Sequence, residues 1–127
     1  MYKPKYRKIM IQIGHPYLDV KFENDVNQIL SFFMNIDVKS FGKEILGMLE
    51  DVLNDKVSNI ECGFNASVII IIKVKTSIVN LIIDDDDELI IDTYELYSLV
   101  YEWLTKLNEF EELGFFAKLR WGKTNDK

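Results

Sequence analysis

The segment NIECGFNASVIIIIKVKTSIVNLII, residues 59–83, predicts three consecutive β-strands. The runs 59–64, 67–74 and 77–83 are rich in β-branched and aromatic residues, and short polar turns separate them. Because connections this short join neighbouring antiparallel strands, these runs predict an antiparallel meander. Every residue of Val68–Ile72 is apolar, so we expect a central strand that is covered on both faces, with helices as the cover.

The sequence before this meander predicts a hairpin followed by two helices. Residues 8–13 and 17–22 alternate between apolar and polar positions, as expected for two paired strands. Asn24 is in a suitable position to cap a first helix, and a second helix is expected from about Phe41. The apolar residues of these helices recur at three- and four-residue steps: Val26, Ile29, Leu30 and Phe33, then Ile45, Met48, Leu49, Val52 and Leu53. The predicted fold class is α+β, mainly an antiparallel sheet packed with about three helices.

The last helix has the clearest start signal in the chain. Asp92 followed by Glu95 matches a capping box, and Ile91 and Leu96 occupy the positions of a hydrophobic staple, so the helix is expected to begin at Thr93. The helix is amphipathic, and its predicted buried stripe comprises Leu96, Leu99, Val100, Trp103, Leu107 and Phe110.

A second stripe of the same helix carries tyrosines. Tyr94, Tyr97 and Tyr101 fall together at about 100° per residue, and Glu95, Glu102 and Glu109 form a third stripe. Tyrosines beside acids suit a protein interface, because the ring supplies area and the hydroxyl supplies a hydrogen bond. The alternative is that the tyrosines form the half-buried margin of the core and the glutamates a solvated helix face.

Five consecutive carboxylates precede this helix: Asp84, Asp85, Asp86, Asp87 and Glu88. Such a run repels itself and must stay in water, so it contributes little to the fold. It indicates either a recognition surface or a solvated loop. The run lacks the alternating spacing and central glycine of an EF-hand loop, and no specific metal site is predicted.

Length and charge indicate one acidic domain over residues 1–127. The chain is 48% hydrophobic and carries a net charge of −6, with basic residues concentrated at both ends. We expect residues 1–7 and 114–127 to be flexible basic tails around an acidic body. An acidic body repels nucleic acid and anionic lipid and attracts a basic protein partner, so neither nucleic-acid nor membrane binding is expected.

The catalytic inventory of the chain is short. His15 stands alone in a turn-like Gly-His-Pro, and Cys62 has no histidine or second cysteine beside it, so neither predicts catalysis. No glycine-rich phosphate loop is present, and no cofactor is expected. A single cysteine cannot form an internal disulfide, and neither an export signal nor a membrane span is visible. These features favour a cytoplasmic protein.

The order of a strand meander, an acid-rich loop and a capped helix resembles the C-terminal half of small bacterial immunity proteins. The resemblance covers about residues 59–110 and rests on I-D-T-Y-E-L at 91–96 and E-W-L at 102–104. Those proteins neutralise polymorphic or contact-dependent growth inhibition toxins. The resemblance implies a non-enzymatic inhibitor that binds one cognate toxin domain, often a basic nuclease.

Other function classes stay open at this point. One alternative is a small adaptor or self-associating domain, with a homodimer formed through a sheet edge or the tyrosine stripe. Another is a metal-dependent enzyme that uses the aspartate run. The predicted partner-binding residues, inferred from surface chemistry, are Asp84, Asp85, Asp86, Asp87, Glu88, Tyr94, Tyr97 and Tyr101.

Overall fold

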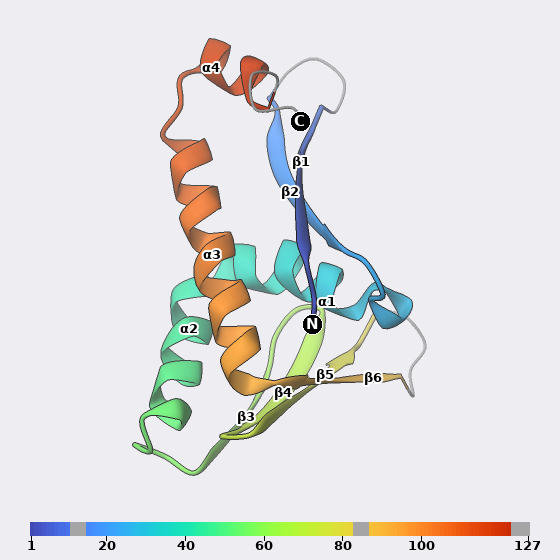
Figure 1. Ribbon diagram of the computed structural model, residues 1–127, viewed down its shortest axis with the longest axis vertical. Coiled ribbons are helices and arrows are strands. Elements are labelled where there is room, and N and C mark those ends of the chain that lie inside the picture. The colour runs from blue at the N-terminus through green and yellow to red at the C-terminus, as the bar shows by residue number, and fades with distance from the viewer. Residues whose placement is uncertain (11–14, 83–86, 123–127) are drawn as a thin grey trace.

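The computed structural model describes residues 1–10, 15–82 and 87–122. Two antiparallel sheets and a group of helices make up the fold, which confirms the α+β prediction (Figure 1). The strands are β1 (Pro4–Ile9), β2 (Tyr17–Phe22), β3 (Asn59–Gly63), β4 (Ser67–Ile72), β5 (Lys75–Asn80) and β6 (Glu88–Asp92). The helical segments are the 3-10 turn η1 (Val26–Gln28), α1 (Ile29–Phe32), the π-helical η2 (Phe33–Val38), α2 (Lys39–Leu53), α3 (Thr93–Glu111) and α4 (Phe115–Arg120).

The predicted meander forms a four-stranded sheet in the order β3-β4-β5-β6. Its fourth strand was not predicted, because residues 90–92 were interpreted only as the approach to the last helix. In β6 the side chains of Leu89 and Ile91 point into the core while those of Glu88 and Ile90 are exposed, which is the alternation of a half-buried strand. The strand therefore carries the chain from the acidic run directly to α3.

The prediction that both faces of Val68–Ile72 are covered is wrong. Ile69 and Ile71 are fully buried against the helices, whereas Ile70 and Ile72 are 41% and 46% exposed. All helices and the hairpin lie on one side of the sheet (Figure 1). Because the helices and the hairpin cover only this side, no described element covers the other face of β4.

The predicted N-terminal hairpin forms, but its first strand lies earlier than residues 8–13. β1 pairs with β2 from Pro4 opposite Phe22 to Ile9 opposite Tyr17. This register brings the ring of Tyr6 onto Trp103 of α3, with centroids 5.7 Å apart and nearly parallel planes. Aromatic packing between distant segments accounts for the shift, and alternation along one strand does not reveal it. Residues 11–13 of the predicted strand lie outside the described residues.

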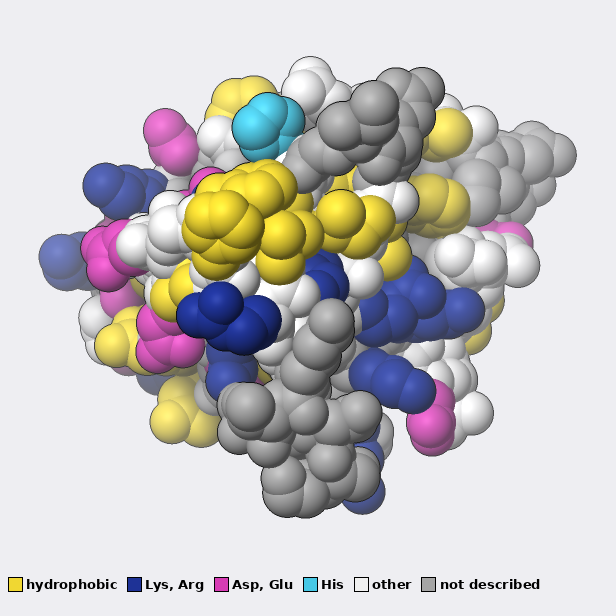
Figure 2. Space-filling model, turned by 90° about the horizontal axis from the view of Figure 1, so that it is seen from above, with side chains coloured by type: hydrophobic (Ala, Val, Ile, Leu, Met, Phe, Trp, Pro, Cys, Tyr) yellow, Lys and Arg dark blue, Asp and Glu magenta, His cyan; other side chains and the backbone are white. Residues whose placement is uncertain are grey.

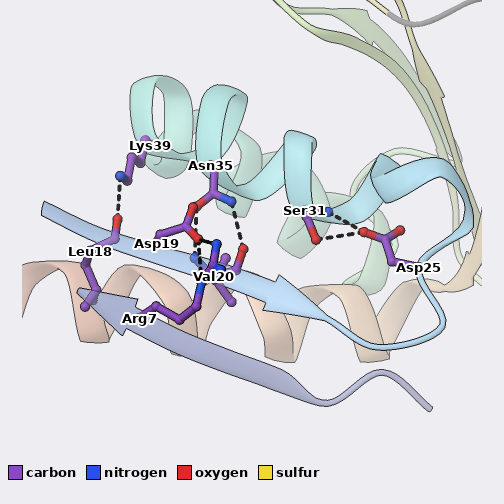
Figure 3. A network of polar contacts seen from close by, with 8 residues as sticks. All are labelled: Arg7, Leu18, Asp19, Val20, Asp25, Ser31, Asn35 and Lys39. Atoms are coloured by element: carbon purple, nitrogen blue, oxygen red, sulfur yellow. Dashed lines mark hydrogen bonds and ion pairs between the residues drawn. The ribbon is translucent and has the colours of Figure 1, made fainter. Parts of the chain in front are cut away.

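Polar side chains of the helices hold the free edge of β2 (Figure 3). The Asn35 amide accepts a hydrogen bond from Val20 N–H (3.0 Å) and donates one to the Val20 carbonyl (2.8 Å), so it takes the place of a neighbouring strand. Lys39 Nζ donates to the Leu18 carbonyl at 2.6 Å, and its ammonium lies 4.7 Å from the Tyr17 ring centroid. These contacts attach the free edge of β2 to η2 and to the start of α2.

The cap of the first helix differs from the prediction. Asp25, not Asn24, accepts hydrogen bonds from the backbone N–H groups of Leu30 (2.8 Å) and Ser31 (2.7 Å). Asn24 adopts a positive φ of 60°, which serves the turn that follows β2. The second helix begins at Lys39, close to the predicted Phe41, and Gly42 lets it approach α3 where a Cβ would overlap the Leu104 side chain.

The predicted flexible tails are in part ordered elements. Residues 4–7 belong to β1, and residues 115–120 form α4. Tyr2 N–H donates to Glu95 at 2.7 Å, Lys8 Nζ donates to the Leu119 carbonyl, and Trp121 packs edge-on against Phe110 with centroids 5.9 Å apart. The aromatic residues among the basic ones attach both ends to α3, which the charge count alone does not show.

Candidate protein-binding surface

Helix α3 is positioned by its N-terminus. The Asp92 carboxylate accepts a hydrogen bond from Glu95 N–H (2.9 Å), which confirms the predicted cap and the start at Thr93. The buried Thr93 hydroxyl lies 2.8 Å from that of Thr76 on β5 and donates to the Ile72 carbonyl. The first turn of α3 is thus joined to two strands of the sheet.

The middle of the buried face of α3 is held in place as well. Trp103 is 1% exposed, and its Nε1 donates to the Met34 carbonyl at 2.8 Å. The predicted buried stripe is confirmed for five residues that face the core: Leu96, Leu99, Val100, Trp103 and Phe110. Leu107, the sixth, is half-buried. With this face locked, the rotation of the helix and the direction of its tyrosines are determined.

Tyr94, Tyr97 and Tyr101 form a continuous tyrosine ridge on α3. Successive ring centroids lie 6.2 Å apart in both pairs, with interplanar angles of 22° and 41°. Tyr94 is 65% exposed and Tyr101 is 55% exposed, whereas Tyr97 between them is half-buried. The structure therefore brings the three predicted tyrosines together and leaves two of the rings largely in solvent.

Helix α2 supports the middle of the ridge. Tyr97 Oη donates to Glu50 Oε2 at 3.2 Å. Desolvation against α2 and the neighbouring Glu50 carboxylate raise the pKa of Tyr97 above its ordinary value. The hydrogen bond to Glu50 favours the protonated phenol and connects the ring of Tyr97 to α2.

Shallow grooves between α2 and α3 flank the ridge. One of 320 Å³ is lined by Glu50, Leu53, Asn54, Tyr94 and Tyr97. Another of 300 Å³ is lined by Lys43, Leu46, Tyr101, Leu104, Thr105 and Asn108. The α2 residues of these grooves were not predicted as site residues, although the helical spacing of Leu46, Glu50 and Leu53 places them on one face. Grooves with mixed polar and apolar walls suit protein side chains better than a buried small molecule.

The glutamate stripe beside the ridge is divided by the fold. Glu102 and Glu109 are exposed, as predicted for a solvated face. Glu95 is half-buried and accepts the hydrogen bond from Tyr2 N–H, so it anchors the N-terminus. Among these carboxylates only Glu50 on α2 contacts the ridge, through Tyr97.

The described part of the acidic run, Asp87 and Glu88, does not join this surface. Asp84, Asp85 and Asp86 lie outside the described residues. Asp87 is exposed and accepts a hydrogen bond from Asn27, and Glu88 begins β6 and accepts one from Ser77. The four residue steps of β6 span roughly 13 Å before α3 begins. The described members of the predicted site thus fall into two groups at opposite ends of β6: Asp87 and Glu88 before it, and the tyrosines after it.

Positive charge gathers at a different end of the molecule. Figure 2 looks onto the hairpin and α4, and Lys and Arg side chains cluster there beside hydrophobic ones. Phe116 of α4 is 70% exposed, and Lys118 and Arg120 occupy the last turn of that helix. The basic side chains of α4 thus lie at the far end of α3 from Tyr94.

Candidate catalytic residues remain apart. His15 is exposed before β2, whereas Cys62 is half-buried in β3 of the other sheet. Within residues 1–10, 15–82 and 87–122, no group of three or more His, Cys, Asp or Glu side chains is arranged to hold a metal ion. No helix in the described ranges combines the length and apolarity needed to cross a membrane.

Comparison of the chain with protein-family models, curated proteins and solved structures finds no match.

Proposed function

We propose that this chain is a non-enzymatic immunity protein that binds and neutralises one cognate toxin domain in the cytoplasm. The observation that carries the proposal is the tyrosine ridge, in which Tyr94 and Tyr101 stay largely in solvent on either side of the half-buried Tyr97. Exposed rings of this kind contribute little to the folded monomer but bury a large area when a partner covers them. The resemblance of residues 59–110 to immunity proteins supports the same reading.

The ridge is prepared for binding before a partner arrives. Its rings contact one another, and Tyr97 is held by Glu50. A side chain that is already ordered loses less conformational entropy on association, so more of the contact energy becomes affinity. Tyr94 and Tyr101, with grooves beside them, have the chemistry of interface hot spots.

The acidic surroundings favour a basic partner. Glu102 and Glu109 lie on the same helix as the ridge, and the whole chain carries a charge of −6. A nuclease domain must present positive charge to its nucleic acid, and the exposed carboxylates of α3 attract such a surface. Asp87 and Glu88 lie away from the ridge, so we assign the acidic run to long-range steering.

Capture of the partner tests this proposal. Tagged wild-type chain is used to capture proteins from the native host at low and at high salt, followed by mass spectrometry. The same capture is repeated with Tyr94→Ala/Tyr101→Ala and with Phe116→Ala, an exposed aromatic control on α4. We expect a basic, toxin-like domain with wild type and the control, weaker retention at high salt, and loss with the double variant.

Two results of this capture would contradict the proposal. Recovery of an abundant housekeeping complex in place of a toxin-like domain would assign the chain to an adaptor. Equal recovery of the same partner by wild type and by the Tyr94→Ala/Tyr101→Ala variant would remove the ridge from the interface. Circular dichroism of each variant establishes that the fold is unchanged.

A self-associating domain is the second candidate function. It is favoured by the open face of the four-stranded sheet, where Ile70 and Ile72 are exposed side by side with residues of the neighbouring strands. Self-association and toxin binding use different surfaces of the molecule, so both can hold for one chain.

A further inference from the structure

The outer sheet face carries exposed apolar side chains that the tyrosine ridge does not explain. We define it as the outward residues of β3 to β6: Asn59, Glu61, Gly63, Val68, Ile70, Ile72, Lys75, Ser77, Val79, Glu88, Ile90 and Asp92. Each outward position of β4 is apolar, and Ile90 on β6 is 49% exposed. Figure 1 shows no described helix or strand below this face.

The register of the sheet makes the apolar side chains contiguous. Val68 pairs with Val79 across β4 and β5, and Ile70 pairs with Ser77, which in turn pairs with Ile90. Scattered exposed apolar residues are normal on a protein surface, but a contiguous patch on a sheet indicates an interaction site. Val74, Leu81 and Ile82, just beyond the ends of β4 and β5, are exposed as well.

We infer that a second copy of this chain covers the outer sheet face, with β4 of one copy packed on β4 of the other. In this arrangement a two-fold axis runs along β4, and the sheets pack face to face in the aligned manner of β-sandwiches. Val68, Ile70 and Ile72 of each copy then meet their own counterparts. An apolar strand on its own copy forms a dry centre for the interface.

The neighbouring strands are complementary under the same axis. The axis lays β3 of one copy over β5 of the other, because each strand adjoins β4 on an opposite side. Gly63, which has no side chain, then lies opposite Val79 of the second copy, and Glu61 lies opposite Ser77. Lys75 of the second copy is one outward position further along, within reach of the Glu61 carboxylate. Each copy thus offers Glu61 on one flank of β4 and Lys75 on the other, with Asp92 of β6 next to Lys75.

The available area suits a weak and reversible dimer. Strands about 4.8 Å apart and residues about 3.4 Å long give this face, with its apolar ends, an area on the order of 500 Å². Two copies would bury about 1,000 Å², which is near the lower limit of specific interfaces. We therefore expect association at micromolar or higher protein concentrations. This inference stands independently of the proposed toxin binding.

Analytical ultracentrifugation across a range of protein concentrations tests the inference. Wild type is expected to change from monomer to dimer as concentration rises. Ile70→Lys places two ammonium groups opposite each other at the two-fold axis and should raise the dimer dissociation constant by about tenfold or more. Phe116→Lys, an equally polar change at an exposed site on α4, should leave the dissociation constant unchanged.

Charge exchange tests the register of the two copies. Glu61→Lys puts a base diagonally across from Lys75 of the second copy, and Lys75→Glu puts an acid diagonally across from Glu61, so each single variant should weaken the dimer. The double variant Glu61→Lys/Lys75→Glu restores opposite charges and should recover dimerisation. The side chains are exposed, and circular dichroism with thermal melting establishes that each variant is folded.

Three results would overturn the inference. A wild-type chain that stays monomeric at the highest soluble concentration would assign the face to another occupant. A dimer that Ile70→Lys leaves intact would place the contact elsewhere. Failure of the double charge variant to recover what its folded single variants lose would contradict the β3-over-β5 register.

Discussion

The Asp37 side chain is fully buried, and its role in this fold is structural. It is 0% exposed in η2, and its Oδ1 accepts a hydrogen bond from Ala66 N–H at 3.0 Å. The side chain thereby connects a helix to the turn between β3 and β4. Burial raises the pKa of the Asp37 carboxyl, and the hydrogen bond from Ala66 opposes that rise.

The raised pKa predicts how Asp37 affects stability with pH. The folded chain binds the proton more tightly than the unfolded chain, so the free energy of unfolding increases as pH falls through the folded pKa. Above that pKa the buried charge is fully destabilising, and below the unfolded pKa its cost disappears. We expect Asp37→Asn to be at least as stable as wild type at pH 7, with a smaller difference near pH 4.

Urea unfolding of wild type, Asp37→Asn and Asp37→Ala at pH 7 and near pH 4 checks this prediction. Asp37→Ala leaves Ala66 N–H without its acceptor and should lower the free energy of unfolding by about 1–3 kcal/mol at pH 7. An Asp37→Asn variant that is clearly less stable than wild type at pH 7 would show that the charge itself stabilises the fold.

At the scale of the element, the start of α3 links the sheet to the tyrosine ridge. Asp92→Ala removes the acceptor of Glu95 N–H and should lower the free energy of unfolding by about 1 kcal/mol. Asp92→Asn keeps a capping oxygen but removes the charge that lies across from Lys75. Chemical denaturation should therefore find Asp92→Asn close to wild type, and an equal loss in both variants would assign the effect to charge.

Elements with local signals could be predicted from the sequence. The cap at Asp92 and the steps from Leu96 to Phe110 predict α3, because the start and the buried stripe of a helix depend on near neighbours. The meander is predicted for the same reason. The fourth strand was missed, since Glu88–Asp92 is short and merges with the helix signal that follows it.

Features that depend on distant contacts could not be predicted. The register of the hairpin places Tyr6 on Trp103, which is far away in the sequence. Asp25 caps the first helix in place of Asn24 because its carboxylate accepts hydrogen bonds from Leu30 and Ser31. An apolar strand is the same in sequence whether helices cover one of its faces or both. The exposure of Ile70 follows only from the side on which the helices lie.

At the scale of the whole molecule, charge and contact are separated. The three tyrosines were predicted as one stripe and do lie together, whereas Glu88, the last residue of the acidic run, begins β6 at the other end of that strand. The 3.6-residue repeat of a helix predicts the grouping of the tyrosines. The distance between Glu88 and the tyrosines depends on β6, which was not predicted from the sequence. The grouping of neighbouring residues on one helix was therefore predicted better than the distance between groups on different elements.

This separation predicts different kinetic effects for the two kinds of residue. Glu102→Gln/Glu109→Gln should slow association with the captured partner and weaken the dependence of the association rate on salt, because exposed charges act mainly through steering. Tyr94→Ala/Tyr101→Ala should chiefly accelerate dissociation, because it removes buried contact. Surface plasmon resonance at several salt concentrations measures both rates, and a charge variant that changes only dissociation would contradict the assignment.

The central claim is that the tyrosine ridge neutralises a toxin, and growth protection measures this most directly. Cells that express the captured toxin-like domain are supplied with wild type, Tyr94→Ala/Tyr101→Ala or Phe116→Ala at matched levels, and survival is counted. The account predicts protection by wild type and by Phe116→Ala, and loss of protection by the double ridge variant. Full protection by the ridge variant, or no protection by wild type, would contradict the account.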